Sequence, residues 1–518
     1  MARFSDLHCH PSMKPYSKAY DLDPNNIVNN IDPSQMNSIW NETNKHASVV
    51  TKVVQEILGV VRYKECDMSK LNRGEVRLVF LSITPPERGF FEMKKSAIVE
   101  FFSMIDPDLL PNFVTDFGDR RIDEFKAESF DYFKDLNNEY QFIAQLDGTV
   151  IPDLGQKYVI AKRGQSLKSQ LDANSGSTLV VLTVEGGHSL FSGSVQDVFS
   201  DARYPLSVLN DRESAGFQEL LALLKGNIAI IKNQWANQAH CPFFLTLNHH
   251  FWNMLAGQAV SLADILVKLV DQSDHVNSEI TELGKEVVDM LLSTDNGPRI
   301  LIDAKHMSAK CRSWFYGYIA LHNSKHPEDN IPVISSHTAA NNYSNIVGSD
   351  EEEVCDGKII ANDKYKKSDI YNNWSIGLSD EEIALIIASD GLIGISMDKR
   401  IVSGYQLKIK FPTIMDGNSE ETMKRWAEPF FNQVAKIYQI ARNKKTSDFF
   451  GNMCIGSDFD GIINPLNAYD TAEAFELLST QLTLLMKNSG LFPGDDIDAA
   501  VEKIMHTNAI DFAERYFH

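Results

Sequence analysis

Two histidines separated by a single residue, His8 and His10, stand near the start of the chain. Side chains alternate along a β-strand, so in a strand both imidazoles would point to one side, about 7 Å apart, while Cys9 would point to the other. Imidazoles placed in this way can converge on one divalent cation. The pattern is also frequent by chance, so its meaning depends on what else the chain brings near it.

Other imidazoles and carboxylates directly follow short apolar runs. Glu185 follows the run Thr178–Val184, and a carboxylate in such a place has to be paired, liganded or solvated. His306, His337 and Asp458 also stand at or just after the ends of apolar runs. Each has an ordinary structural explanation, because a histidine at a strand end is more often a satisfied core or surface residue, and an aspartate before glycine is often a turn residue. The recurrence of the pattern is what indicates a site.

The apolar runs alternate with helical patterns along the whole chain. The runs, which are typical of buried parallel strands, are Arg3–Leu7, Val76–Ser82, Thr178–Val184, Phe243–Leu247, Arg299–Ile302, Pro332–Ile334, Leu392–Ile395 and Met453–Ile455. Helical patterns include Glu213–Leu224, Ser261–Val270, Leu283–Leu292 and Asp380–Ala388, the last with Ser379 as its predicted start. This alternation predicts an α/β fold, a (β/α)8 TIM-like barrel of the metal-dependent hydrolase type. An open doubly wound sheet is the alternative, since periodicity does not separate the two.

A barrel would bring the polar strand ends together. Its active site lies at the face formed by the carboxyl ends of the strands, which is where four histidines and two carboxylates would then meet. Mixed imidazole and carboxylate ligands suit zinc first, with manganese or iron as alternatives. The sequence therefore predicts a metal site at this face.

Long connections interrupt the strand–helix alternation. We expect residues 1–518 to form one barrel domain with insertions at about 11–72, 189–211, 338–376 and 403–445. The last insertion carries Phe430, Val434, Ile437 and Ala441 at helical spacing. Long polar loops after barrel strands tend to form lids, so the third insertion is a candidate lid.

Composition narrows the class of partner. The net charge of −21 argues against a nucleic acid as the main partner, because phosphate binding needs a basic face. No apolar run of about 18 residues and no signal peptide is recognisable, so we expect no membrane segment and a cytoplasmic location. Cysteines at positions 9, 66, 241, 311, 355 and 454 form no CxxC pair, which indicates free thiols in a reducing compartment.

The chain resembles the membrane (renal) dipeptidase family of zinc peptidases, within the amidohydrolase superfamily. The resemblance runs from Phe4 to about Phe517 in one order. The segments that carry it are Val184-Glu-Gly-Gly-His-Ser189, Leu245-Thr-Leu-Asn-His249, Ile302-Asp-Ala-Lys-His306, Ser336-His337 and Ile455-Gly-Ser-Asp-Phe-Asp-Gly461.

The resemblance implies two divalent cations, most simply Zn²⁺. It assigns His8, His10 and Asp458 to one ion and His306 and His337 to the other, with Glu185 bridging both. Two such ions would hold a hydroxide between them and polarise a small amide or peptide carbonyl. Catalytic roles would fall to Glu185, to Asp458 as proton shuttle to the leaving amine, and to His249 as the group that stabilises the oxyanion.

The same resemblance gives neighbouring residues supporting roles. His188 would shape its loop rather than bind metal, and Asp460 would support the turn around Asp458. Lys305 would point away from His306, because side chains alternate along a strand. Family members tend to be homodimers, so a homodimer is implied, with a dipeptide or other small molecule as substrate.

The first departure from the family is His10, where members typically carry aspartate. The histidine leaves the site one unit more positive. We expect this charge to lower the pKa of a water at the metals, or to favour anionic groups there.

The second departure concerns the substrate. Ile376 stands where the family has the arginine that binds the dipeptide carboxylate, and Asp398 stands where it has a tyrosine. Lys399, Arg400 or a lysine of the third insertion could substitute, although a lysine is a poorer bidentate clamp. Asp398 and Arg400 are thus predicted substrate-binding residues together with His249, while an ordinary surface role for Lys399 and Arg400 remains the alternative.

Three functional hypotheses follow. The first is a dinuclear metal-dependent amide hydrolase, dipeptidase-like in its chemistry. The second is an enzyme of the same superfamily that acts on a non-peptide bond in a lactone, a cyclic amide or an amino-purine. The third is a non-catalytic relative, against which the complete ligand set argues.

Overall fold

Eight parallel strands form the centre of the molecule. The computed structural model describes residues 3–42, 63–92, 111–112, 115–262, 269–349, 353–355, 358–360, 370–408 and 419–517. The strands follow one another around the sheet in the order β1 (Phe4–Cys9), β2 (Val76–Ile83), β4 (Thr178–Glu185), β5 (Phe244–Thr246), β6 (Leu301–Asp303), β7 (Ile334–Thr338), β10 (Leu392–Ile395) and β11 (Met453–Ile455). Every neighbouring pair is parallel.

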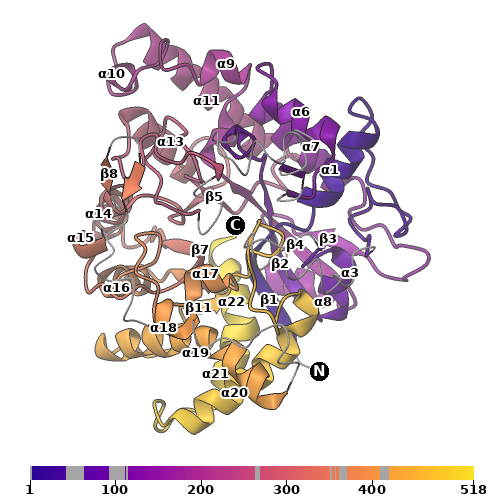
Figure 1. The fold of residues 1–518 in the computed structure, drawn as a ribbon, viewed down its shortest axis with the longest axis vertical. Coiled ribbons are helices and arrows are strands. Elements are labelled where there is room, and N and C mark those ends of the chain that lie inside the picture. The colour runs from indigo at the N-terminus through magenta and orange to yellow at the C-terminus, as the bar shows by residue number, and fades with distance from the viewer. Residues whose placement is uncertain are drawn as a thin grey trace.

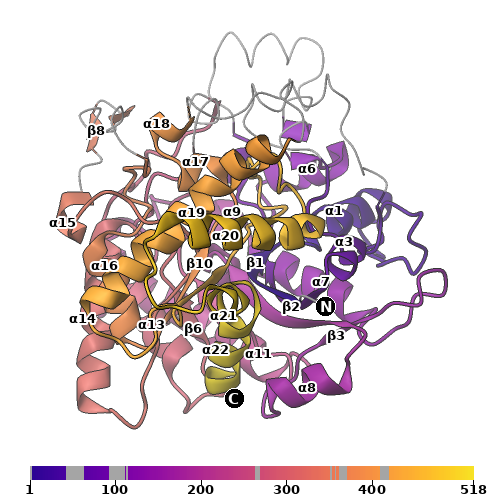
Figure 2. The same cartoon turned by 90° about the horizontal axis from the view of Figure 1, so that it is seen from below.

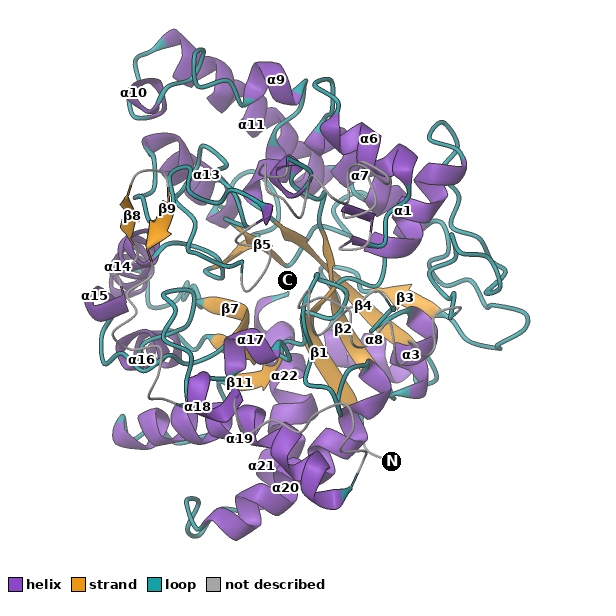
Figure 3. Ribbon diagram, viewed as in Figure 1, coloured by secondary structure: helices purple, strands orange, loops and turns teal. Residues whose placement is uncertain are grey.

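The last strand returns to the first. Cys9, the last residue of β1, and Phe459, which lies beyond the end of β11, form a parallel bridge. The Asp458 amide donates to the His8 carbonyl at 2.9 Å, and the His10 amide donates to the Phe459 carbonyl at 2.9 Å. Figures 1 and 3 show the strands as a ring at the centre, enclosed by helices. The predicted (β/α)8 barrel is therefore confirmed, and the open sheet is excluded.

The helices that follow the strands form the outer layer. The longer ones are α1 (Met13–Leu22), α6 (Asp119–Lys126), α7 (Tyr132–Ala144), α11 (Ala215–Asn233), α13 (Glu282–Leu292), α14 (Ala309–Lys325), α16 (Asp380–Ala388), α19 (Glu420–Asn443), α20 (Phe475–Ser489) and α22 (Asn508–Tyr516). The shorter ones are α3 (Met68–Arg73), η1 (Arg88–Phe90), α8 (Leu167–Ala173), η2 (Gly187–Leu190), α9 (Val195–Val198), α10 (Leu206–Leu209), α15 (Ile346–Ser349), α17 (Lys399–Val402), α18 (Tyr405–Lys408), η5 (Ala472–Ala474), α21 (Ile497–Glu502) and the π-helical η6 (Lys503–Thr507). Figure 2 shows α17 and α18 at one end of the barrel and α8 and α22 at the other.

The strands are held by apolar side chains on both faces. All eight residues of β4 are buried, as are all but one of β2, which is expected where one face meets the barrel interior and the other meets the helices. Backbones also approach closely inside the barrel. A Cβ added at Gly394 or at Gly456 would lie 1.8 Å from the Ser336 carbonyl oxygen, so both positions require glycine.

Most predicted elements are present, with shifted ends. Strands β10 and β11 and helix α16 have the predicted bounds, and Ser379 and Glu382 form the capping box of α16. Strand β7 begins at the end of the predicted run and continues through four polar residues to Thr338, because serine and histidine side chains fill the barrel interior there. A ninth strand, β3 (Tyr158–Ile160), pairs with β4 outside the ring and was not predicted.

The predicted insertions contain structure of their own. The range 11–72 includes α1 and α3, 189–211 includes α9 and α10, and 403–445 includes α18 and α19, whose four apolar residues at helical spacing are buried. The range 338–376 includes α15 and a hairpin of β8 (Glu353–Cys355) and β9 (Lys358–Ile360). The predicted helix Ser261–Val270 falls largely on residues 263–268, outside the described part, while Ser261 and Leu262 lie in a loop.

Two further expectations concern cysteines and membranes. The cysteines at 9, 66, 241, 311 and 454 are buried free thiols, which confirms the prediction of unpaired thiols for these five. Among the described helices, none is both long and apolar enough to cross a lipid bilayer.

Candidate metal centre

Six side chains from five strand ends meet at the carboxyl face of the barrel. His8 lies in β1 and His10 just after it, Glu185 ends β4, and His337 lies in β7. The other two lie three residues past the end of a strand: His306 comes after β6 and Asp458 after β11. All six are buried, with exposed fractions from 0 to 7%. The structure thus brings together the complete set of predicted metal ligands.

The first group consists of His8, His10 and Asp458. The Nε2 atoms of the two histidines are 3.1 Å apart, and Asp458 Oδ1 lies 3.9 Å from His8 Nε2 and 3.7 Å from His10 Nε2. Two imidazoles that bind one tetrahedral zinc ion at 2.0–2.1 Å have their nitrogens about 3.3 Å apart. This group therefore has the spacing of a metal site.

The second group consists of His306, His337 and Glu185. The two Nε2 atoms are 3.0 Å apart, and each is 3.5 Å from Glu185 Oε1. Glu185 also reaches the first group, because its Oε1 is 3.4 Å from His8 Nε2 and its Oε2 is 3.1 Å from His10 Nε2. Glu185 thus lies between the two imidazole pairs, where the resemblance placed a bridging carboxylate.

Two of the six predicted ligands, His306 and Asp458, have an unusual backbone conformation. His306 has a φ of 65° and Asp458 a φ of 63°, a left-handed conformation that costs non-glycine residues free energy. Such conformations persist where the surrounding structure determines them, and they concentrate at functional sites. The alternation rule of a regular strand therefore does not apply to the residues around His306.

Hydrogen bonds behind the imidazoles fix how the rings face the centre. His10 Nδ1 lies 3.0 Å from the Ser82 carbonyl oxygen, to which it donates, so Nε2 faces the other ligands as an acceptor. His337 Nδ1 lies 2.8 Å from Ser336 Oγ, which in turn donates to Asp303 Oδ2 at 2.6 Å. Metal-binding histidines are commonly oriented by partners of this kind.

Two buried aspartates support the strand ends from inside the barrel. Asp303 also accepts from Thr246 Oγ1 at 2.7 Å and from the Ser336 amide at 3.0 Å, which ties β5, β6 and β7 together. Asp6 accepts from the Ser457 amide at 2.9 Å and from the Ser457 hydroxyl, which ties β1 to the segment after β11. Neither aspartate was predicted from the sequence, although both precede predicted ligands by two or three residues.

Burial and neighbouring charges set the protonation of the centre. Burial lowers the pKa of His306 to about 3 and also lowers the pKa of His337, with His8 adding to the effect on His337. Both rings are therefore neutral, which is the form that binds metals. Burial, together with the charge of Glu185, raises the pKa of Asp458. The carboxylates of Glu185 and Asp458 lie close together, and a cation bound between them would offset the repulsion of their charges.

His249 lies beside the centre and is held by a carboxylate that the sequence had not indicated. Its Nε2 is 3.6 Å from Glu185 Oε2, and its Nδ1 is 2.8 Å from Glu87 Oε2. Burial lowers the pKa of His249, but Glu185 and Glu87 outweigh burial and raise it to about 9. His249 is therefore a protonated donor at neutral pH. Glu87 lies in the loop after β2, four residues past its end, so the rule that found Glu185 does not reach it.

The two supporting residues from the sequence occupy the expected places. Asp460 accepts from Lys14 Nζ at 2.7 Å and from the amides of Glu65 and Cys66 at 3.1 Å each, which anchors the turn after Asp458. His188 contacts the Pro85 carbonyl oxygen through Nε2 at 2.8 Å and thereby joins the loops after β2 and β4.

A narrow pocket leads to the centre. Its polar lining includes His249, His250, His306, Asp398, Arg400 and Asp458, and its apolar lining includes Phe90, Leu262, Ile376, Ile401, Ile462 and Ile463. All three predicted substrate-binding residues therefore line it. His250 was not predicted, although it directly follows His249.

Asp398 and Arg400 are engaged with each other. Arg400 donates to both carboxylate oxygens of Asp398, from Nε at 2.9 and 3.0 Å and from Nη2 at 2.7 Å. Lys399 turns elsewhere, donating to Asn467 Oδ1 at 3.0 Å. Both basic residues are buried, at 8% and 7% exposure, so the alternative of ordinary surface charges is wrong. Lys364, Lys366 and Lys367 of the third insertion lie outside the described residues.

Lys305, which precedes His306 in the chain, is a buried lysine. It is 1% exposed, and its Nζ has no hydrogen-bond partner among the described residues. Burial lowers its pKa to about 8, against the opposing effect of Asp458, Asp303 and Asp398. Its charged neighbours therefore belong to the site, which is consistent with the left-handed turn at His306.

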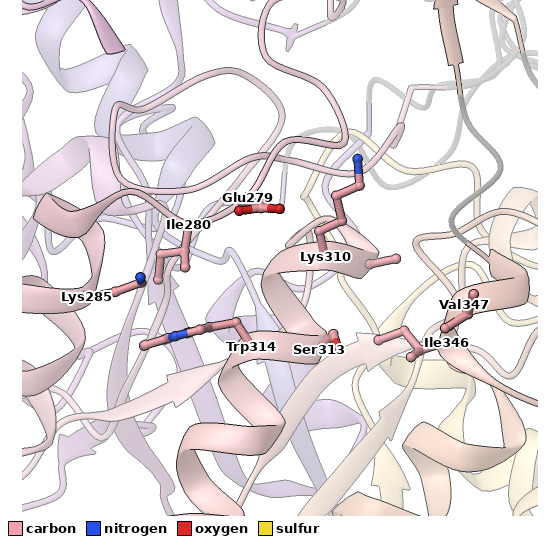
Figure 4. A pocket seen from close by; sticks show the side chains of 9 residues that line it. Glu279, Ile280, Lys285, Lys310, Ser313, Trp314, Ile346 and Val347 are labelled. Carbon is pink, nitrogen blue, oxygen red and sulfur yellow. The ribbon is translucent and has the colours of Figure 1, made fainter. Parts of the chain in front are cut away.

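A second pocket of about 410 Å³ lies apart from the centre, between α13, α14 and α15. Figure 4 shows its lining, which includes Glu279, Lys285, Lys310, Trp314 and Val347. Lys285 is paired with Glu282 at 2.6 Å. None of the predicted metal ligands lines this pocket, so the candidate site is the narrow one.

Comparison with known proteins gives similarity in structure only. No family model and no curated protein sequence matches the chain. Among solved structures, a metallo peptidase from Rhodobacter sphaeroides with a phosphinate mimic of the dipeptide L-Ala-D-Ala is 12% identical, with 99% of each chain covered and a TM-score of 0.47. The probable dipeptidase PvdM from Pseudomonas aeruginosa is 14% identical (88% of this chain, 89% of that chain, TM-score 0.44). An amidohydrolase from the same organism is 13% identical (87% and 91%, TM-score 0.42).

Proposed function

We propose that this protein is a metal-dependent amide hydrolase with a dinuclear centre, and that it cleaves small amides or dipeptides. One observation carries the proposal: Glu185 lies between two imidazole pairs whose nitrogens are 3.1 and 3.0 Å apart, with Asp458 beside them. The arrangement is built from five strand ends at the face where barrel enzymes carry their active sites.

The residues fit a pair of divalent cations. Glu185 Oε1 is buried and has no hydrogen-bond partner among the described residues, although three imidazole nitrogens lie 3.4–3.5 Å from it. A buried carboxylate is costly unless paired or bound to metal. His8, His10 and Asp458 would hold one ion, and His306 and His337 the other, with Glu185 shared. Nitrogen and oxygen ligands of this kind suit zinc.

The protein's own residues would then perform three tasks. When bound, the cations would polarise the scissile carbonyl and lower the pKa of the attacking water. His249, held by Glu87, would donate to the oxygen of the tetrahedral intermediate. Asp458 would take the proton of the water and pass it to the leaving amine. The apolar pocket wall would exclude bulk water from the reacting groups.

A second candidate function is hydrolysis of a non-peptide bond. Ile376 lines the pocket where the family would place its carboxylate-binding arginine, and Arg400 is already paired with Asp398 in a bidentate geometry. These two features favour a substrate without a free carboxylate, such as a lactone or a cyclic amide.

A hydrolysis panel separates these functions. Protein loaded with zinc should cleave at least one member of a panel of L,L and L,D dipeptides, their amides, cyclic dipeptides and lactones, and chelation should abolish the activity. Hydrolysis of dipeptides supports the first function, and hydrolysis of lactones or cyclic amides alone supports the second. Protein that binds two zinc ions and cleaves none of them would contradict both.

A further inference from the structure

His250 is a polar residue of the pocket that the proposed mechanism does not use. Its ring lies against Phe90 and His306, with centroids 5.0 and 4.9 Å away, and lines the pocket next to His249. Its backbone amide donates to Glu87 Oε2 at 3.0 Å, so the carboxylate that holds His249 also holds this residue. The position of the His250 ring is therefore fixed from the backbone.

A chain of hydrogen bonds determines which ring nitrogen carries the proton. Gln272 Oε1 accepts from the amides of Ser261 and Leu262, at 3.1 Å each. Backbone amides only donate, so the Gln272 atom that accepts from them must be the side-chain oxygen. The Gln272 amino group is therefore the group that faces Ser261 Oγ, at 2.6 Å. The same amino group donates to the His250 carbonyl oxygen at 2.6 Å.

The Ser261 hydroxyl determines which ring nitrogen of His250 accepts a hydrogen bond. Ser261 Oγ accepts from Gln272, and its own proton has a single acceptor among the described residues, His250 Nδ1 at 2.6 Å. Nδ1 is therefore the acceptor of the ring, and a neutral imidazole then carries its proton on Nε2. Ser261 and Gln272 are buried, so water does not replace these bonds readily.

We infer that His250 is a specificity-determining residue whose Nε2–H binds an oxygen of the substrate next to the scissile amide. The inference rests on the proposed amide hydrolysis. The group recognised is an oxygen acceptor flanking the amide, either a carboxylate or a carbonyl. Leu262 and Ile376 form part of an aliphatic wall of the same pocket, so the substrate should carry an apolar side chain next to this acceptor.

A third metal site is the competing use of the same residue. Ring nitrogens of His249, His250 and His306 lie within 4.8 Å of one another, as three ligands of one ion could. Metal binding through His250 Nε2 would require the proton on Nδ1. The Ser261 proton would then lose its acceptor inside a buried network, which costs free energy. The hydrogen-bond chain therefore favours the donor.

Three substrates test the substrate contact with the zinc-loaded protein. Leucyl-leucine carries a carboxylate, leucyl-leucinamide a neutral carbonyl, and leucyl-3-methylbutylamide no acceptor at that position. His250→Leu should raise KM for leucyl-leucinamide roughly 3- to 10-fold relative to the third substrate, the range of one neutral hydrogen bond. The increase should be larger for leucyl-leucine, whose acceptor is charged, with little change in kcat for either. His250→Gln keeps an N–H near the Nε2 position and should restore most of the difference. Ser261→Ala removes the group that fixes the tautomer and should show an intermediate loss.

Neutron crystallography of the zinc-loaded protein decides the tautomer. We expect deuterium on His250 Nε2 and none on Nδ1. Deuterium on Nδ1 alone, or a metal ion on Nε2, would overturn the inference, as would an equal effect of His250→Leu on all three substrates. These results differ from a failure of the proposed function, in which none of the three substrates would be cleaved at all.

Discussion

One carboxylate contacts five imidazoles. Glu185 Oε1 faces His8, His306 and His337, and Oε2 faces His10 and His249. A carboxylate accepts at about four lone-pair positions, so it cannot satisfy all five rings by hydrogen bonds alone. Cations bound between the rings and the carboxylate would remove this conflict. The arrangement of these side chains therefore supports a metal centre.

Glu87 offers a test at the same scale. Glu87→Gln removes the negative charge behind His249 and places an amino group against backbone donors at His250 and Phe251. We expect kcat to fall about 10- to 100-fold, as for a missing partner of an active-site residue, with a smaller change in KM. Steady-state kinetics on the best substrate measures both. An unchanged kcat would show that Glu87 does not position a catalytic group.

His10 offers a second residue-scale test. His10→Asp introduces the residue that the dipeptidase family typically carries at this position and adds one negative charge beside the proposed ions. The added charge should raise the pKa of a water at the centre, so the acidic limb of the kcat/KM profile should move to higher pH. A pH–rate profile and a metal affinity equal to those of the wild type would contradict the role assigned to His10.

The ligands that the sequence could identify are those that end a predicted strand or follow it within a few residues. His8, Glu185, His337 and Asp458 follow or end apolar runs, so their place at one face follows once the barrel is assumed. Glu87, His250 and the supporting aspartates were missed because their roles depend on contacts between loops. The orientation expected for Lys305 stays a prediction, because the chain leaves extended geometry at His306 and strand alternation does not apply there.

At the element scale, the predicted strands are those whose residues are apolar on both faces. Strand β7 was placed too early, since Ser335–Thr338 is polar and yet buried in the barrel interior. Strand β3 was not predicted; it pairs with β4 outside the ring. Helix ends marked by capping residues were predicted well, as α16 shows.

The C-terminal segment and β1 allow a test at this scale. His506 in η6 contacts Ser5 Oγ through Nδ1 at 3.2 Å, and burial with the charge of Arg3 lowers its pKa from 6.5 to about 4. Between these values the unfolded chain binds a proton that the folded chain does not, so stability rises with pH in this window and the contribution is lost below pH 4.

His506→Gln should therefore flatten the dependence of Tm on pH between about 4 and 6.5 relative to the wild type. Thermal unfolding followed by circular dichroism over this range measures the slope, with His322→Gln in α14 as the matched control. An identical slope in His506→Gln would contradict the assignment.

At the scale of the whole molecule, the barrel explains why distant residues form one site. His8 and Asp458 are separated by most of the chain, yet the closure of β11 on β1 makes them neighbours. The other ligands come from three more strands of the same ring. No local sequence pattern contains this information; it follows from the parallel order of the strands.

The metal content of the purified protein tests the central claim most directly. Elemental analysis of protein loaded with zinc and then dialysed should give about two ions per chain for the wild type and for Glu219→Gln, a control on the surface of α11. Glu185→Gln should give one ion or none, because the shared carboxylate holds both. Wild-type protein that retains no metal, or a Glu185→Gln variant that retains two ions with unchanged affinity, would contradict the account.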